Sequence, residues 1–179
     1  TFRALQGVGA GLVARAAREA GARSFVHVSA LGANRLSPSA YAQTKAEGED
    51  LVRRAYPASV ILRPSINFGP EDAFFNRFAA MGRISPLMPL IGGGRTRFQP
   101  VYVADVAQAV VAGLDGRAKP GVTYELGGPR AYSFRELLDL VADWTEHRRP
   151  YFPIPFWLAK LQGLFLQVLP NAPLTLDQV

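Results

Sequence analysis

The stretch SPSAYAQTKAEGE, residues 37–49, decides the fold, because it predicts a helix that carries a chemically specific pair of side chains. Tyr41 and Lys45 are four residues apart, so on an α-helix they lie on one face, one turn from each other. A nearby ammonium group favours the phenolate and lowers the pKa of a tyrosine from its reference value of about 10. We therefore expect Tyr41 to exchange a proton with an alcohol or carbonyl, and Lys45 to hydrogen-bond the hydroxyls of a ribose.

Two apolar runs flank this helix and predict a parallel sheet. Residues 24–29 (SFVHVS) and 59–64 (SVILRP) read as strands, and the helix between them is expected to end near Tyr56. Apolar and polar residues do not alternate in the first run, which is typical of a parallel strand buried on both faces. Ser29 closes this strand, at the edge where open α/β sheets bind ligands. Pro64 is expected to end the second strand because proline has no N–H to donate.

Composition and charge exclude several classes of function. Of the 179 residues, 49% are hydrophobic and 19% are charged, as in a globular chain. The chain has no Cys and only two His, so disulfides and thiolate metal sites are excluded and no metal site is predicted. The net charge of +6 comes from scattered Arg without interleaved aromatic residues, so no nucleic-acid partner is expected. No apolar run reaches the roughly 18 residues of a membrane span.

The N-terminal segment predicts a helix over residues 3–20, with Gly21 as its stop. Its glycine-rich segment GVGAG, residues 7–11, is not a dinucleotide fingerprint, because the third glycine is replaced by Leu12 and no strand precedes it. These glycines are interpreted as positions of close helix packing or fraying. Since the strand, glycine-rich turn and helix that open a dinucleotide-binding sheet are absent, we expect the C-terminal portion of a longer protein.

The middle of the chain predicts short elements joined by turns. A helix is expected over residues 71–82, followed by a glycine-rich turn. Arg95 and Arg97 in this turn form a weak candidate site for a substrate or anion, with a plain turn as the alternative. A strand over residues 98–103 then leads into an apolar helix, for which Asp105 is the expected N-cap.

The C-terminal part predicts a strand at 123–126, a capped helix and an apolar tail. Ser133 and Glu136 form a capping box for a helix that ends near Glu146. A further helix is expected over residues 151–169. Its apolar face either packs on its own domain or docks on a partner subunit or a membrane surface.

Taken together, these motifs resemble the extended or atypical branch of the short-chain dehydrogenase/reductase superfamily. They are most similar to the nucleotide-binding accessory subunit of respiratory complex I and its bacterial relatives. The resemblance covers nearly the whole chain and rests on several motifs in the same order: FVHVSALGA (25–33), YAQTKAEGE (41–49), LRPSINFGPED (62–72), FFNRFA (74–79), QPVYVADV (99–106) and PIPF (153–156).

The resemblance implies a site for NADP or NAD, with NADP preferred. Tyr41 and Lys45 would contact the nicotinamide ribose, Ser29 would lie beside the nicotinamide ring, and the loop from Pro64 to Phe68 would cover it. The implied catalytic set is Ser29, Tyr41 and Lys45. The implied cofactor-binding residues are Ser29, Ala30, Tyr41, Lys45, Pro64, Ser65, Ile66 and Phe68.

The resemblance also implies a fold and a domain organisation. The fold is α/β, the C-terminal portion of a Rossmann-like, doubly wound parallel sheet with a small C-terminal helical region for substrate binding or docking. Residues 1–150 would belong to the NAD(P)-binding domain, with substrate-region segments at about 71–97 and 121–150 interleaved in it. Residues 151–179 would form an apolar helical tail.

Two functions follow from the resemblance. In the complex I subunit the bound nucleotide is regarded as structural, which implies a structural or regulatory cofactor and a respiratory-complex or membrane-surface partner reached through residues 151–169. The alternative is an active NAD(P)-dependent reductase, dehydrogenase or nucleotide-sugar epimerase that uses the catalytic set. Ile66 stands where sugar-nucleotide enzymes usually carry Asn, and the separation of Ser29 from Tyr41 (41 − 29 = 12) is short, so a sugar substrate is disfavoured. The expected location is the bacterial cytoplasm, peripheral to the inner membrane, or the matrix side of a mitochondrion.

Overall fold

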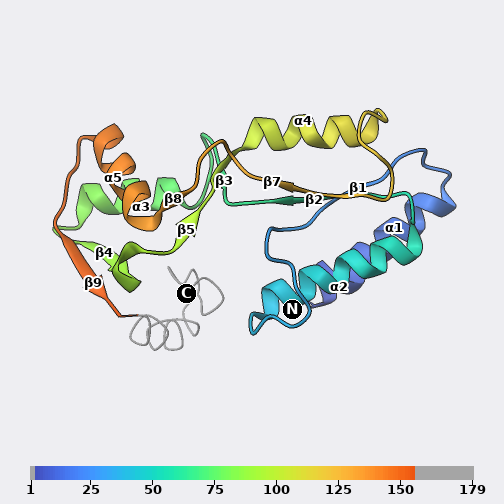
Figure 1. Ribbon diagram of the computed structural model, residues 1–179, viewed down its shortest axis with the longest axis horizontal. Coiled ribbons are helices and arrows are strands. Elements are labelled where there is room, and N and C mark those ends of the chain that lie inside the picture. Colours follow the sequence, from blue (N-terminus) through green and yellow to red (C-terminus); the bar gives the residue numbers. More distant parts are fainter. Residues whose placement is uncertain (1–2, 156–179) are drawn as a thin grey trace. The chain divides into compact units, whose positions relative to one another are not determined.

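The computed structural model describes residues 3–155, which fall into two compact units. Unit 1 comprises the chain up to Asn67 and the stretch Val101–Pro129. Unit 2 comprises Phe68–Pro100 and the chain from Arg130 onward. Each unit is therefore assembled from two separate stretches of sequence, and Figure 1 labels their helices and strands.

Unit 1 is built on a three-stranded parallel sheet in the order β1-β2-β7. Its strands are β1 (Val26–Val28), β2 (Val60–Pro64) and β7 (Thr123–Leu126). Ile61 of the central strand β2 opposes His27 on one side and Thr123 on the other, and its side chain is fully buried. Burial of the central strand on both faces is what a parallel sheet between helices requires.

Helices cover both faces of this sheet (Figure 1). One face carries η1 (Arg3–Gly9), which is a π-helical segment, together with α1 (Ala10–Glu19) and α2 (Ala40–Ala55). The other face carries α4 (Val103–Leu114). The predicted doubly wound α/β arrangement is therefore confirmed, as are the two helices predicted on either side of the first strand.

Glycines allow the N-terminal helical run and α2 to approach closely. A Cβ atom added at Gly11 would lie 2.8 Å from the Cβ of Leu51, and one added at Gly48 would lie 2.2 Å from the carbonyl oxygen of Gln6. Neither distance leaves room for a side chain, so only glycine permits the crossing. This confirms the interpretation of the segment at 7–11 as a helix-packing segment rather than a phosphate-binding loop.

The described part of unit 2 contains two helices, a 3₁₀ turn and two strand pairs, with β4 parallel to β9 and β5 antiparallel to β8. Its elements are α3 (Phe75–Ile84), β4 (Met88–Ile91), η2 (Gly92–Gly94), β5 (Arg97–Phe98), β8 (Tyr132–Ser133), α5 (Phe134–Thr145) and β9 (Tyr151–Ile154). Two further short strands, β3 (Asn67–Phe68) and β6 (Val101–Tyr102), stand where the chain passes from one unit to the other.

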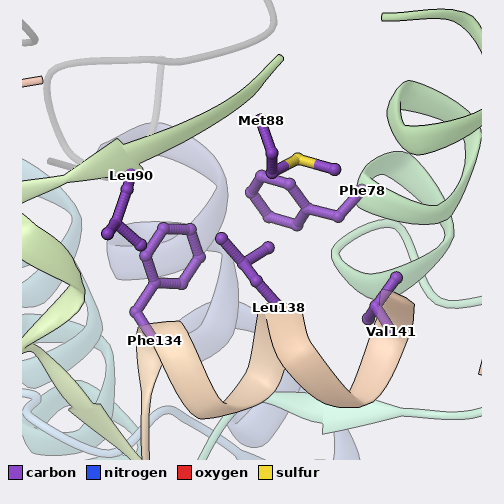
Figure 2. Close-up of a cluster of buried hydrophobic side chains, with 6 residues drawn as sticks. All are labelled: Phe78, Met88, Leu90, Phe134, Leu138 and Val141. Carbon is purple, nitrogen blue, oxygen red and sulfur yellow. The ribbon is translucent and has the colours of Figure 1, made fainter. Parts of the chain in front are cut away.

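The core of unit 2 is an apolar cluster contributed by α3, β4 and α5 (Figure 2). The rings of Phe78 and Phe134 meet edge to face, with their centroids 5.4 Å apart, and Leu138 is 3% exposed. Edge-to-face contacts stabilise aromatic pairs beyond the area that they bury. The cluster consists of Phe78, Met88, Leu90, Phe134, Leu138 and Val141.

Helix α5 begins with the predicted capping box. The hydroxyl of Ser133 accepts the N–H of Glu136 at 3.2 Å, and the carboxylate of Glu136 accepts the N–H of Ser133 at 2.7 Å. The helix ends at Glu146, whose φ of 58° places it in the left-handed region of a C-cap. Both predicted ends of this helix are therefore confirmed to within one residue.

Of three predicted details near the strands of unit 1, two are wrong and one is confirmed. Val28 is 42% exposed, so β1 is not buried along its whole length; within residues 3–155, β1 pairs with β2 alone and lies at the sheet edge. Pro64 is the last residue of β2, as predicted, and the N–H of Ser65 just beyond it donates to the carbonyl of Leu126. Asp105 is not the N-cap of α4, which begins one turn earlier at Val103, although its carboxylate still favours the positive end of the helix.

Predicted elements in unit 2 also differ. The strand expected over 98–103 is interrupted between β5 and β6 at Pro100, which has no N–H for a ladder. Strand β7, which lies within the predicted substrate-region segment 121–150, pairs with β2 in the sheet of unit 1. The tail expected to be helical from Tyr151 begins as strand β9, paired along β4, and the remainder of that helix lies outside the described residues.

Candidate functional site

Helix α2 is positioned by its N-cap and by a contact with the strand that precedes it. The hydroxyl of Ser39 accepts the N–H of Ala42 at 3.4 Å, which fixes the start of the helix at the carboxyl end of the sheet. One turn later Lys45 donates from Nζ to the carbonyl oxygen of Val28 at 3.4 Å. The predicted face of α2 that carries Tyr41 and Lys45 therefore does meet the end of β1.

The predicted electrostatic activation of Tyr41 is wrong. Burial raises the pKa of the Tyr41 phenol above its ordinary value instead of lowering it. The geometry explains this result, because Nζ of Lys45 lies over the aromatic ring, 5.8 Å from its centroid, and donates to a backbone carbonyl. Tyr41 is therefore a neutral hydroxyl at neutral pH, suited to donating a hydrogen bond or a proton rather than accepting a proton as phenolate.

Ser29 lies at the carboxyl end of β1 as predicted, but its side chain is enclosed. Its N–H donates to Leu62 at 2.7 Å, and the residue is 4% exposed. Its hydroxyl oxygen is buried without a hydrogen-bond partner among the described residues. A buried hydroxyl without a partner costs about 1–3 kcal/mol, so an oxygen or nitrogen from a bound molecule would relieve that cost.

A buried ion pair next to these residues was missed by the sequence analysis. Glu49 is 5% exposed and accepts two hydrogen bonds from Arg63, from Nε at 2.9 Å and from Nη2 at 2.8 Å. Arg63 also reaches Glu125 of β7 at 3.4 Å. The hydrogen bonds and charge of Glu49 raise the pKa of the Arg63 guanidinium. The sequence does contain a signal for the position of Glu49: it follows Lys45 by four residues and therefore lies on the same helix face.

The charges of the ion pair and of Lys45 act on one another and on His27. Burial lowers the pKa of the Lys45 ammonium, and the nearby Glu49 carboxylate opposes this shift. Burial also lowers the pKa of His27, with a further contribution from Lys45, so its imidazole is neutral at neutral pH. The Nε2 atom of His27 is buried without a partner among the described residues.

The loop after β2 runs along the same edge of the sheet. The carbonyl of Pro64 accepts the N–H of Leu31 at 2.9 Å, which places Ala30 beside it. Ser65 is bonded to β7, and the carbonyl of Ile66 accepts the N–H of Val101 at 3.0 Å. Seven of the predicted site residues therefore lie in unit 1: Ser29, Ala30, Tyr41, Lys45, Pro64, Ser65 and Ile66.

Three predicted residues lie in the other unit. Phe68 packs its ring against Phe75, with centroids 6.1 Å apart. Arg97 donates to the carbonyl of Ala131 at 3.2 Å, and Arg95 is exposed in the turn before it. The role of Phe68 in the cofactor site and the anion site at the two arginines both stay predictions.

Within residues 3–155, no group of three or more His, Asp or Glu side chains is arranged to hold a metal ion. None of the described helices is long and apolar enough to cross a membrane.

A parallel sheet covered by helices on both faces, with Ser29, Tyr41 and Lys45 at its carboxyl edge, defines an α/β protein of the dinucleotide-binding class. The family model described as "NAD dependent epimerase/dehydratase family" matches residues 7–127. This match covers more than half of the chain, so the chain belongs to that family of NAD(P)-binding proteins. The resemblance to extended short-chain dehydrogenases is thereby confirmed.

Similar curated proteins include a respiratory-chain subunit and an enzyme. The chain is 42% identical over 141 residues to the mitochondrial NADH dehydrogenase [ubiquinone] 1 alpha subcomplex subunit 9 of Arabidopsis thaliana, covering 78% of this chain and 35% of that protein. It is 40% identical over 104 residues to a ceramide reductase of Caulobacter vibrioides, covering 58% of this chain and 32% of that protein. The chain thus spans about a third of the length of these relatives.

A solved structure confirms the fold. The dTDP-glucose 4,6-dehydratase from Bacillus anthracis, determined in complex with NAD, superposes with a TM-score of 0.74 at 16% identity. The superposition covers 99% of this chain and 65% of that one. At this level of identity the likeness concerns the fold alone.

Proposed function

We propose that the protein to which this chain belongs binds a nicotinamide dinucleotide as a structural or regulatory group and associates with a respiratory NADH dehydrogenase. The 42% identity to the Arabidopsis thaliana subunit supports the association. The orphaned hydroxyl of Ser29 and the hydroxyl and ammonium groups of Tyr41 and Lys45 fit a bound ribose and nicotinamide. The net charge of +6 favours NADP, which carries one more phosphate than NAD.

One observation carries the structural rather than the catalytic role. In an enzyme that reduces a carbonyl, the serine hydroxyl and the tyrosine hydroxyl both have to touch the substrate oxygen. The Ser29 side chain is instead enclosed at 4% exposure, and burial raises the pKa of the Tyr41 phenol. This arrangement supports contact with a single tightly held molecule better than exchange of substrate and product.

The alternative is an active NAD(P)-dependent reductase. It is favoured by the intact set of Ser29, Tyr41 and Lys45 and by the 40% identity to the ceramide reductase. A neutral Tyr41 phenol is the correct protonation state for a general acid that protonates an alkoxide during carbonyl reduction. A nucleotide-sugar substrate is less well supported, because the matching structures of sugar enzymes resemble this chain only in fold.

Cofactor retention tests the proposal directly. The full-length protein is purified without added nucleotide, denatured, and the supernatant is separated by liquid chromatography. We expect close to one NADP(H) per chain, and dissociation constants of about 1 µM or lower when NADPH is titrated into emptied protein. Protein that carries no dinucleotide and binds neither NADPH nor NADH at this level would refute the proposed function.

A pair of lysine variants locates the site. Lys45→Met should weaken NADPH binding about tenfold or more, since it removes the ammonium that faces the ribose. Lys119→Met removes an exposed lysine from a loop of unit 1 and serves as the matched control, with unchanged affinity. Equal affinities of the two variants would show that the dinucleotide binds elsewhere.

Tyr41→Phe separates the two functions. If the cofactor is structural, the variant keeps its dinucleotide and the wild-type protein does not consume NADPH with carbonyl substrates. If the protein is a reductase, Tyr41→Phe should lower turnover by about 10²–10⁴-fold. Tyr132→Phe, which removes a hydroxyl from unit 2, is the control for the loss of a tyrosine hydroxyl.

A further inference from the structure

The buried pair of Glu49 and Arg63 lies next to the predicted cofactor residues without being one of them. Its two hydrogen bonds, at 2.8 and 2.9 Å, form the planar, bidentate arrangement that arginine makes with a carboxylate. The carboxylate is almost fully enclosed, while Arg63 is 25% exposed at its side chain. A buried ion pair seldom stabilises a fold more than apolar residues of the same size would. Stability alone therefore does not account for this pair, and its effect on the geometry of α2 becomes the question.

The pair attaches α2 to the sheet at a second point: Glu49 lies one turn beyond Lys45, and its partner Arg63 lies on β2, the strand next to β1. Lys45 is tied to β1 through the carbonyl of Val28, and Val28 is the register partner of Leu62 on β2. Arg63 is the residue after Leu62, so the two anchors meet adjacent positions of the sheet. Two successive turns of one helix are thus held by two adjacent strands.

This double attachment fixes both the rotation and the sliding of α2. A slip of one residue would rotate a helix by about 100° and would carry both side chains away from their strand partners. A contact between two apolar residues would tolerate partial sliding, whereas two parallel N–H···O bonds set both distance and direction. The exposed second partner of Arg63, Glu125, holds the guanidinium from the side of β7.

We propose that Glu49 and Arg63 are positioning residues for Lys45, which keep its ammonium group at the carboxyl edge of the sheet where the dinucleotide ribose binds. The role rests on the proposed dinucleotide function, but the placement of Lys45 itself is a property of the protein without cofactor. The negative charge of Glu49 also favours the protonated state of Lys45. Only the protonated ammonium group carries the full set of N–H donors for the ribose hydroxyls.

The test compares Glu49→Gln with Glu125→Gln in the full-length protein. Both variants make the same chemical change in a partner of Arg63, but only Glu49 lies on the helix face of Lys45. The first readout is the rate at which acetic anhydride acetylates Lys45 relative to Lys119, measured by mass spectrometry on cofactor-free protein. The second readout is the dissociation constant for NADPH.

We expect Glu49→Gln to raise the relative acetylation of Lys45 about threefold or more, because the amine becomes both freer and less protonated. The NADPH dissociation constant should rise by about tenfold. Glu125→Gln should leave both values within twofold of the wild type. A purely structural pair would lower the melting temperature in Glu49→Gln without changing the acetylation ratio, and that result would overturn the proposal.

A second variant keeps the proposal testable if Glu49→Gln does not fold. Arg63→Lys preserves the positive charge but cannot form two parallel hydrogen bonds, so it should weaken NADPH binding in the same direction. If the wild-type protein binds no dinucleotide, the proposed function fails while the acetylation ratio still decides the positioning role. If the wild type binds and Arg63→Lys or Glu49→Gln changes neither readout by more than twofold, the positioning role alone is overturned.

Discussion

Replacing Gly48 by alanine tests whether the close approach of α2 to the N-terminal helical run holds unit 1 together. The added methyl group would lie 2.2 Å from the carbonyl oxygen of Gln6. That oxygen belongs to the backbone, so no side chain can rotate away to make room. Because real Cβ atoms stay at least 3.0 Å from such neighbours, the two helices would have to separate by about 1 Å (3.0 − 2.2 = 0.8).

The expected cost follows from two opposing effects. Overpacking a close contact costs roughly 1–3 kcal/mol, since neighbouring side chains lose their contacts when the backbones move apart. Alanine is favoured over glycine inside a helix by about 0.5–1 kcal/mol. The free energy of unfolding of Gly48→Ala should therefore fall by about 1–2 kcal/mol.

The assay is urea unfolding of the full-length protein, followed by circular dichroism. Gly7→Ala is the matched control in the same pair of helices, because its Cβ would meet Glu47 at the ordinary distance of 3.6 Å. We expect Gly7→Ala to be neutral or to stabilise the protein by up to about 1 kcal/mol. Equal stabilities of the two variants would refute the reasoning that the crossing depends on the absence of a side chain at Gly48.

Two further predictions concern the core of unit 2 and a buried imidazole. Leu138→Ala should lower the free energy of unfolding by about 2–5 kcal/mol, more than Leu140→Ala on the same helix, where the leucine is only partly buried; urea unfolding measures both. Burial depresses the pKa of His27, so below a pH of about 6.5 the unfolded chain gains a proton that the folded chain resists. Stability should therefore fall as the pH is lowered from about 7.5 to about 5.5, and His27→Gln should flatten this fall; equal slopes would contradict it.

The sequence was sufficient for features that depend on local spacing. The interval between Tyr41 and Lys45 predicted a shared helix face, and the structure places that face against the end of β1. The capping box at Ser133 identified the start of α5, because its two hydrogen bonds involve residues only three positions apart. The order of strand, helix and strand between residues 24 and 64 predicted a parallel pair, which β1 and β2 form.

Features that depend on distant residues were not predictable in this way. Burial raises the pKa of Tyr41, and the burial of a side chain depends on the elements that pack around it. The partner of Glu49 is Arg63 on the next strand, and spacing alone does not pair them. The tail residues at 151–154 looked like the start of an apolar helix, whereas pairing with β4 makes them a strand.

The division of the chain into two units has a consequence for how the protein is made and cut. The backbone passes between the units after residues 67, 100 and 129, so neither unit exists as one continuous piece of sequence. In the sequence, the middle strand β2 and its neighbour β7 are separated by a 33-residue excursion, residues 68–100, which is the first of the two stretches of unit 2. A ribosome therefore cannot complete the sheet of unit 1 before it has synthesised that excursion. A truncation between residues 68 and 122 would remove β7 from unit 1 and, at the same time, the second stretch of unit 2.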